Sequence, residues 1–118
     1  MERVSVKVSS NQILKITNVL RALGLNTSLK GTKLLNKAIQ YIISTNSDFF
    51  TIEDVYNYIH NYYDISYYQV KSAIYYAITN RNNEKAKKNF ERIFNYEYDV
   101  YSFVPKLLIE EISNILVN

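Results

Sequence analysis

The residue types that usually carry enzymatic chemistry or bind metals are scarce in this sequence. It has one histidine, His60, and no cysteine, so a thiolate nucleophile, a disulfide and a zinc site of the usual Cys/His spacing are excluded. Glu110 and Glu111 are adjacent, so on a helix they point to different sides and do not form a catalytic carboxylate pair. Gly24 and Gly31 do not form a phosphate-binding loop. We therefore expect no enzyme, no catalytic residue, no metal and no cofactor.

One stretch, SYYQVKSAIYYAIT at 66–79, has side chains suited to contacting another molecule. Apolar residues recur in it at the spacing of one helix face, which must be buried: Val70, Ala73, Ile74, Ala77 and Ile78. The other face is polar and rich in tyrosine, and amide, ammonium, hydroxyl and phenol groups of this kind can contact base edges or phosphates. We predict that it reads DNA bases through Gln69, Lys71, Ser72, Tyr75 and Tyr76. The alternative is that Tyr75 and Tyr76 belong to a packed interior.

A second short helix is predicted directly upstream, at residues 52–62. Thr51 precedes it and Asp54 follows three residues later, as in a variant capping box. Ser66 is placed to cap the next helix, and residues 63–65 form the break between the two. Two short helices with a tight break, the second with a polar outer face, are typical of a helix-turn-helix.

The remaining pattern predicts an all-α fold of a single domain with six helices. The other helices are expected to end near Leu23, to start at Thr32, to be capped by Asn82 or Asn83, and to begin at Pro105. We expect an N-terminal arm or leader at residues 1–9, with Val4, Val6 and Val8 alternating with polar residues, and the helical domain at 10–118. No run of 18 apolar residues occurs, so we expect no membrane association and a cytoplasmic location.

Positive charge is concentrated in two segments although the net charge is only +3. Residues 1–50 contain seven Lys or Arg against two acids, and residues 81–92 contain five against two. A basic surface built from both segments can follow a phosphate backbone, and an ordinary solvated surface of mixed charge is the alternative. The phosphate candidates are Lys30, Lys33, Ser66, Tyr68, Arg81 and Lys85.

Four segments resemble one known family in order and spacing. They are ITNVLRALGL (16–25), LKGTKLLNKAI (29–39), VKSAIYYAI (70–78) and NFERIF (89–94). Together they resemble the C-terminal DNA-binding domain of stage zero sporulation protein A, the response regulator that starts endospore formation. The resemblance implies six helices, with the third and fourth forming the helix-turn-helix and the fourth entering the major groove of double-stranded DNA. It also implies contact with an RNA polymerase sigma factor through the region after the fourth helix, and dimer contacts through the last helix.

The sequence departs from the family in two respects. The family's fourth helix is arginine-rich, whereas the outward positions predicted here carry no arginine that could grip guanine bidentately. The family's phosphoacceptor receiver domain is not among these 118 residues, so we expect no switching by phosphorylation of the family's type if they are the whole product.

We therefore predict a sequence-specific DNA-binding transcription regulator of the sporulation type that lacks a receiver domain. The alternative is a protein-interaction module that keeps the fold, has lost specific DNA binding and modulates a partner. The final helix is apolar on more than one side, so it has surface for the core and for a second copy. With the resemblance, this predicts a homodimer that forms with the help of DNA, with Leu107 or Ile109 at the contact.

Overall fold

The computed structural model of the chain describes residues 8–46 and 49–117. Those residues form six α-helices, one 3-10 turn and no strand, so the predicted all-α fold of six helices is confirmed. Val4 and Val6 of the predicted arm lie outside the described residues, and Val8 has no regular secondary structure. The elements are α1 (Ser10–Ala22), α2 (Lys30–Thr45), α3 (Ile52–Tyr63), α4 (Tyr67–Thr79), α5 (Asn83–Phe94), η1 (Val100–Ser102) and α6 (Pro105–Val117).

Most of the helix boundaries follow from local capping. Four helices begin with a side chain that accepts a hydrogen bond from a backbone N–H of the first turn, as an N-cap should: Ser9, Thr51, Ser66 and Asn82. Three helices end at a residue in the left-handed conformation, which Asn and Asp tolerate better than most residues: Asn46, Asp64 and Asn95. The break after Asp64 separates α3 from α4, as the helix-turn-helix prediction requires.

The start of α2 differs from the prediction. Lys30 is its first residue, two positions before Thr32, and Gly31 therefore lies inside the helix rather than in the preceding connection. Leu29 is at the N-cap and gives no side-chain hydrogen bond. Local capping therefore does not explain this boundary, and tertiary packing of the first turn against α4 does, as shown below.

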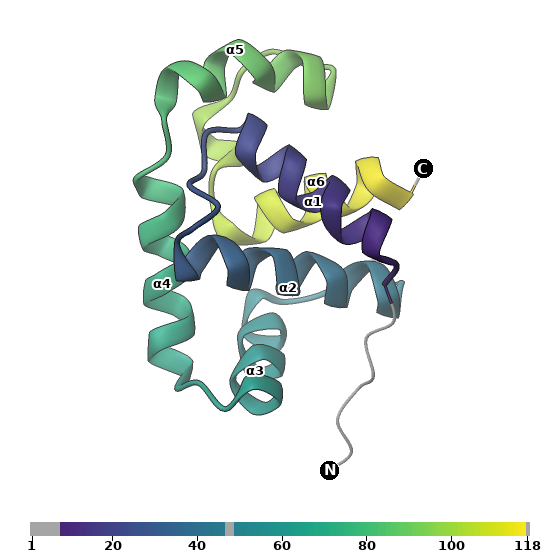
Figure 1. The fold of residues 1–118 in the computed structure, drawn as a ribbon, viewed down its shortest axis with the longest axis vertical. Helices are drawn as coiled ribbons and strands as arrows, with labels where there is room; N and C mark the ends of the chain where they lie inside the picture. Colours follow the sequence, from purple (N-terminus) through teal and green to yellow (C-terminus); the bar gives the residue numbers. More distant parts are fainter. Residues whose placement is uncertain (1–7, 47–48, 118) are drawn as a thin grey trace.

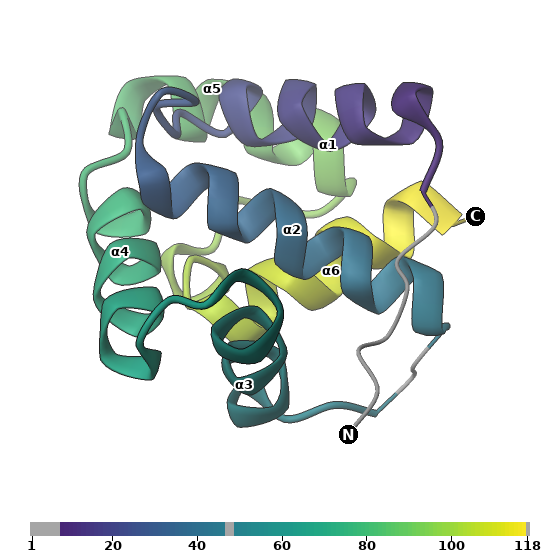
Figure 2. The same cartoon turned by 60° about the horizontal axis from the view of Figure 1, so that its bottom comes forward.

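Helix α2 lies at the centre of the molecule and is the one against which the others are arranged (Figure 1). Its most extensive packing is with α4, and it also packs against α6, α1 and α3. Helix α4 runs along one side of the molecule, nearly perpendicular to α2 in that view, and α3 lies beneath α2. The turned view shows α3 below α2 and α4 still at the edge of the molecule (Figure 2). One face of α4 is thus left uncovered by the rest of the domain.

The segment between α5 and α6 closes the opposite end of the core with aromatic rings. Phe90 is fully buried, and four rings lie around it with centroids 4.9 to 5.8 Å away: Phe94, Tyr96, Tyr98 and Phe103. Residues 95–103 contain η1 and supply three of these rings. This packing fixes the start of α6 relative to α5.

Candidate nucleic-acid interface

The uncovered face of α4 carries the residues predicted to read bases. Tyr75 and Tyr76 are 64% and 57% exposed, Gln69 and Lys71 are exposed, and Ser72 is half-buried. The opposite face is buried, through Val70, Ile74, Ala77 and Ile78. The predicted orientation of α4 is therefore confirmed, and the alternative that Tyr75 and Tyr76 are interior residues is wrong. Ala73 is the exception on the apolar face, because it is only half-buried.

A groove of about 460 Å³ lies between the first turn of α2 and the exposed face of α4. It is lined from α4 by Tyr68, Gln69, Ser72, Ala73 and Tyr76, and from the start of α2 by Leu29, Lys30 and Gly31. Three base-reading candidates and two phosphate candidates therefore line one hollow, although they come from helices distant in sequence. We call it the α2–α4 groove.

A second groove, of about 520 Å³, lies on the other side of α4, where α3 and α6 begin. It is lined by Ile52, Glu53, Tyr56, Tyr67, Lys71, Ser72, Tyr75, Val104, Pro105 and Lys106. Burial, with Tyr67 and Glu53 nearby, raises the pKa of the Tyr56 phenol to about 12. The exposed ridge of α4 thus stands between two hollows.

The first turn of α2 is the most favourable place for a phosphate. Lys30 and Lys33 are exposed there, the turn has no acidic residue, and no side chain caps it. Unpaired backbone N–H groups and the helix dipole give a helix N-terminus a partial positive charge, and the two lysines add to it. A phosphate bound at this turn would offset that local repulsion.

The other phosphate candidates differ in their exposure to solvent and in the hydrogen bonds that they already make within the fold. Tyr68 is 77% exposed, and Lys85 is exposed in the first turn of α5. The Ser66 hydroxyl accepts a hydrogen bond from the Gln69 N–H at 3.1 Å, so as an acceptor it already serves as the N-cap of α4.

Arg81 is held by the fold. Its guanidinium carbon lies 3.9 Å from the centre of the Phe103 ring, and Nη1 donates a hydrogen bond to the Ile78 carbonyl at 2.9 Å. The side chain is half-buried, with Nε covered. A guanidinium stacked on a ring joins the end of α4 to the aromatic cluster, so Arg81 is poorly placed for the phosphate contact predicted for it.

The family comparison agrees with this arrangement. The family model described as sporulation initiation factor Spo0A C terminal matches residues 16–106. The chain belongs to this family. No curated protein and no solved structure matches it. Spo0A C-terminal domains bind DNA and regulate transcription in sporulation, and the matched residues include both α3 and α4. The predicted family, with its DNA-binding and regulatory character, is therefore confirmed.

The predicted dimer contacts of this Spo0A C-terminal domain lie just beyond the matched residues. Leu107 is 41% exposed, whereas Ile109 is fully buried in the core. The prediction for Ile109 as a surface contact is therefore wrong, because the broad apolar pattern of α6 is satisfied within one chain by α1, α2 and α4. Exposed apolar residues that the sequence reasoning missed lie close to Leu107 in the chain: Val100, Tyr101 and Val104.

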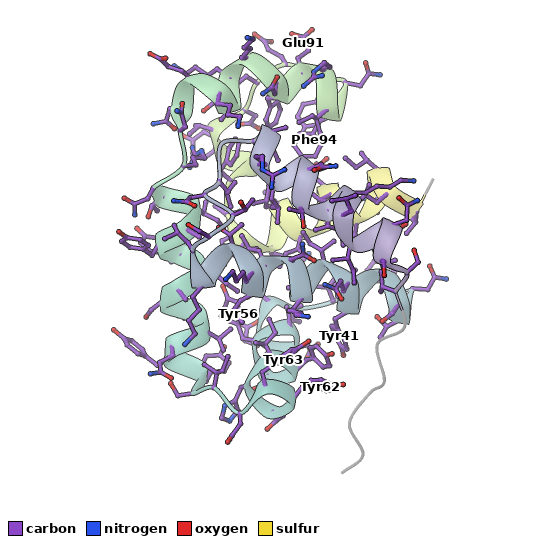
Figure 3. The ribbon with its side chains drawn as sticks, viewed as in Figure 1. Tyr41, Tyr56, Tyr62, Tyr63, Glu91 and Phe94 are labelled. Carbon is purple, nitrogen blue, oxygen red and sulfur yellow. The ribbon has the colours of Figure 1, made fainter. Side chains whose placement is uncertain are left out.

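A cluster of tyrosines joins α2 to α3 and was also missed. The rings of Tyr41 and Tyr58 stack with centroids 4.0 Å apart, the Tyr62 ring packs tilted against Tyr58, and the Tyr63 ring meets Tyr58 edge-on. Figure 3 shows Tyr41, Tyr62 and Tyr63 gathered where α2 and α3 meet. The Lys37 ammonium lies 5.6 Å from the centre of the Tyr63 ring. The helical spacing of Tyr58 and Tyr62 could have indicated that the two rings lie on one face of α3, but it does not identify Tyr41 on α2 as their partner. These rings stabilise the α2–α3 packing.

Within residues 8–46 and 49–117, no group of three or more metal-ligating side chains comes together. His60, the lone histidine, is half-buried and its Nδ1 lies at hydrogen-bond distance from the Ile65 carbonyl, across the break before α4. None of the described helices is both long and apolar enough to span a membrane.

Proposed function

We propose that these 118 residues bind double-stranded DNA sequence-specifically, without the help of a receiver domain, and so regulate transcription of sporulation genes. The observation that carries the proposal is the α2–α4 groove, where Lys30 lies beside base-reading candidates on an uncovered helix face. In a helix-turn-helix the second helix lies in the major groove while neighbouring helices contact the backbone. DNA binding of this kind would place the protein with the nucleoid in the cytoplasm.

The proposed base contacts differ from those of a recognition helix that binds guanine through arginine. Gln69 can pair bidentately with adenine, and Tyr75 and Tyr76 can contact thymine methyl groups or phosphates. Lys71 and Ser72 complete the face between them. The bound sequence should therefore be richer in A·T pairs than a site read by arginine at guanine.

Selection of duplexes from a random pool tests the proposal directly. With the purified chain, we expect one enriched sequence, A·T-rich at its centre, bound at least about 1,000-fold more tightly than random DNA at the same salt concentration. Equal binding to all duplexes would contradict sequence-specific recognition, because only electrostatic attraction to DNA would remain. No binding at low salt would contradict DNA binding altogether.

Phosphate contact at the first turn of α2 gives the second prediction. Lys33→Ala should weaken binding to selected and random duplexes alike, and should reduce the slope of log K against log salt by about one unit. Lys15→Ala, which removes the same charge from an exposed position on α1, is the matched control and should leave the slope unchanged. An effect of Lys33→Ala on only one DNA sequence would contradict a phosphate contact.

We propose that Leu107 contacts a second copy on DNA with two half-sites. Its exposed apolar surface is small, so the free chain should be a monomer by light scattering, and two copies should bind a duplex with half-sites about one helical turn apart. Leu107→Asp should reduce the complex to one copy per duplex while preserving binding to a single half-site. A tight dimer without DNA would show that the assembly does not depend on DNA.

A protein-interaction module is the second candidate function, favoured by the exposed tyrosines of α4 and by the exposed Val100, Tyr101 and Val104. The resemblance points to an RNA polymerase sigma factor as partner, through the segment that follows α4. We propose this contact at the exposed face of α5, where Lys88 and Arg92 lie. Binding of purified sigma factor by the wild-type chain and not by Lys88→Glu would support it.

A further inference from the structure

Both glycines of the chain lie where another backbone comes too close for a side chain. A methyl group on Gly31 would overlap the carbonyl oxygen of Ala73 on α4, and it would also lie 2.9 Å from the Ala77 Cβ. Glycine within a helix is destabilising relative to alanine, so its place in the first turn of α2 needs a reason outside the helix. The close contact with α4 supplies that reason.

The α4 side of this contact is built from small residues at helical spacing. Ala73 contributes its backbone carbonyl and Ala77, one turn later, its Cβ, so the backbones of the two helices come close at this point. Ala77 is fully buried, and Ala73 lies at the edge of the α2–α4 groove. The contact is therefore directly beneath the groove that contains Lys30, Gln69 and Tyr76.

Gly24 contacts the segment that joins α4 to α5. Its φ is +91°, and its carbonyl accepts a hydrogen bond of 2.8 Å from the N–H of Asn82, the N-cap of α5. A methyl group on Gly24 would overlap the Asn82 carbonyl. The first turn of α2 thus contacts α4 near its middle through Gly31, and the connection before α2 contacts the N-cap of α5, three residues after the end of α4, through Gly24.

We propose that Gly31 is a positioning residue for DNA recognition. It holds the phosphate-binding first turn of α2 at a fixed distance from the base-reading face of α4, so that one rigid unit contacts backbone and base edges together. A side chain at this position forces the two helices apart. Each can still contact DNA, but the phosphate contact no longer sets the register in which α4 meets the bases. The inference rests on the proposed function, because it concerns how sequence-specific binding is achieved.

The test compares specific and random duplexes at one salt concentration with Gly31→Ala. Affinity for the selected sequence should fall by roughly tenfold or more, the discrimination of one well-formed base contact. Affinity for random DNA should change by less than about threefold, because it depends on charges that remain. Ile16→Val is the control: it alters a fully buried α1 residue outside this contact and should keep the wild-type ratio of specific to random affinity even if the urea midpoint falls.

A second variant, Ala77→Val, widens the same contact from the α4 side and should give the same selective loss. The inference is overturned if both variants fold and keep the wild-type ratio, or if they weaken specific and random binding equally. It is also overturned if neither folds, because the contact would then be a requirement of the fold and not of recognition. A wild-type chain with no sequence preference would instead refute the proposed function, and this inference with it.

Discussion

Ala77→Glu is expected to abolish the cooperative unfolding transition of the domain. Ala77 is fully buried on the face of α4 that packs against α2, and its Cβ lies 2.9 Å from the position that a methyl group on Gly31 would take. Burying an unpaired carboxylate costs several kcal/mol, which is a large part of the roughly 5 to 15 kcal/mol that stabilises a domain of this kind. Circular dichroism during thermal or urea denaturation should show a broad change or none.

Tyr76→Ala is the matched control, because it changes the neighbouring residue on the exposed face of the same helix. Tyr76 is 57% exposed, so its truncation should alter the free energy of unfolding by no more than about 0.5 kcal/mol. A large fall in melting temperature for Tyr76→Ala would mean that the tyrosines of α4 pack against the core. Ala73→Glu should be milder than Ala77→Glu, since Ala73 is half-buried and a charge there can reach solvent.

The orientation of α4 could be predicted because its sequence contains the whole signal. Five apolar residues at helical spacing define a buried side whatever they pack against, and Ser66 marks the start through a local hydrogen bond. The capping residues Thr51 and Asn82 act within a few positions in the same way. Features that arise from neighbours in sequence were therefore predicted correctly.

The features that differ from what the sequence suggested depend on partners distant in sequence. The predicted start of α2 at Thr32 placed Gly31 before the helix, but the close contact with the carbonyl of Ala73, 42 positions later, explains why it lies inside the helix. Arg81 was predicted to contact a phosphate, but its guanidinium stacks on the ring of Phe103, 22 positions later. Ile109 was predicted to contact a second copy because α6 is apolar on more than one side. It is fully buried, because α1, α2 and α4 of the same chain pack against α6. Periodicity indicates that a face is covered, but it does not say by which neighbour.

The side chains of the exposed α4 face and of the α2–α4 groove decide whether DNA binding or protein binding is the better supported function. Tyrosine is common at protein interfaces as well as in contacts with nucleic acids, so exposure of Tyr75 and Tyr76 fits both. The α2–α4 groove is less ambiguous, because it combines a helix N-terminus that lacks a side-chain cap with Lys30, and Lys33 lies in the same first turn. A protein interface gains little from that combination, whereas a phosphate backbone gains both charge and hydrogen bonds.

Salt concentration is therefore expected to have the second large effect. Three of the phosphate candidates are exposed lysines: Lys30, Lys33 and Lys85. If each neutralises one phosphate, the slope of log K against log salt is about −2.7, and affinity for a duplex falls about 40-fold between 50 and 200 mM salt. Fluorescence anisotropy on a duplex with one half-site gives this slope for a single copy of the chain.

The same titration separates the two candidate functions. Burial of tyrosine and valine side chains against a protein releases no condensed counterions, so binding to a protein partner through that surface should change only a few-fold over the same range of salt. Lys33→Ala should bring the slope for DNA to about −1.8, while Tyr76→Ala should lower affinity and leave the slope unchanged. A slope near zero for the wild-type chain, with affinity retained at 200 mM salt, would contradict the phosphate contacts on α2 and favour the protein-binding alternative.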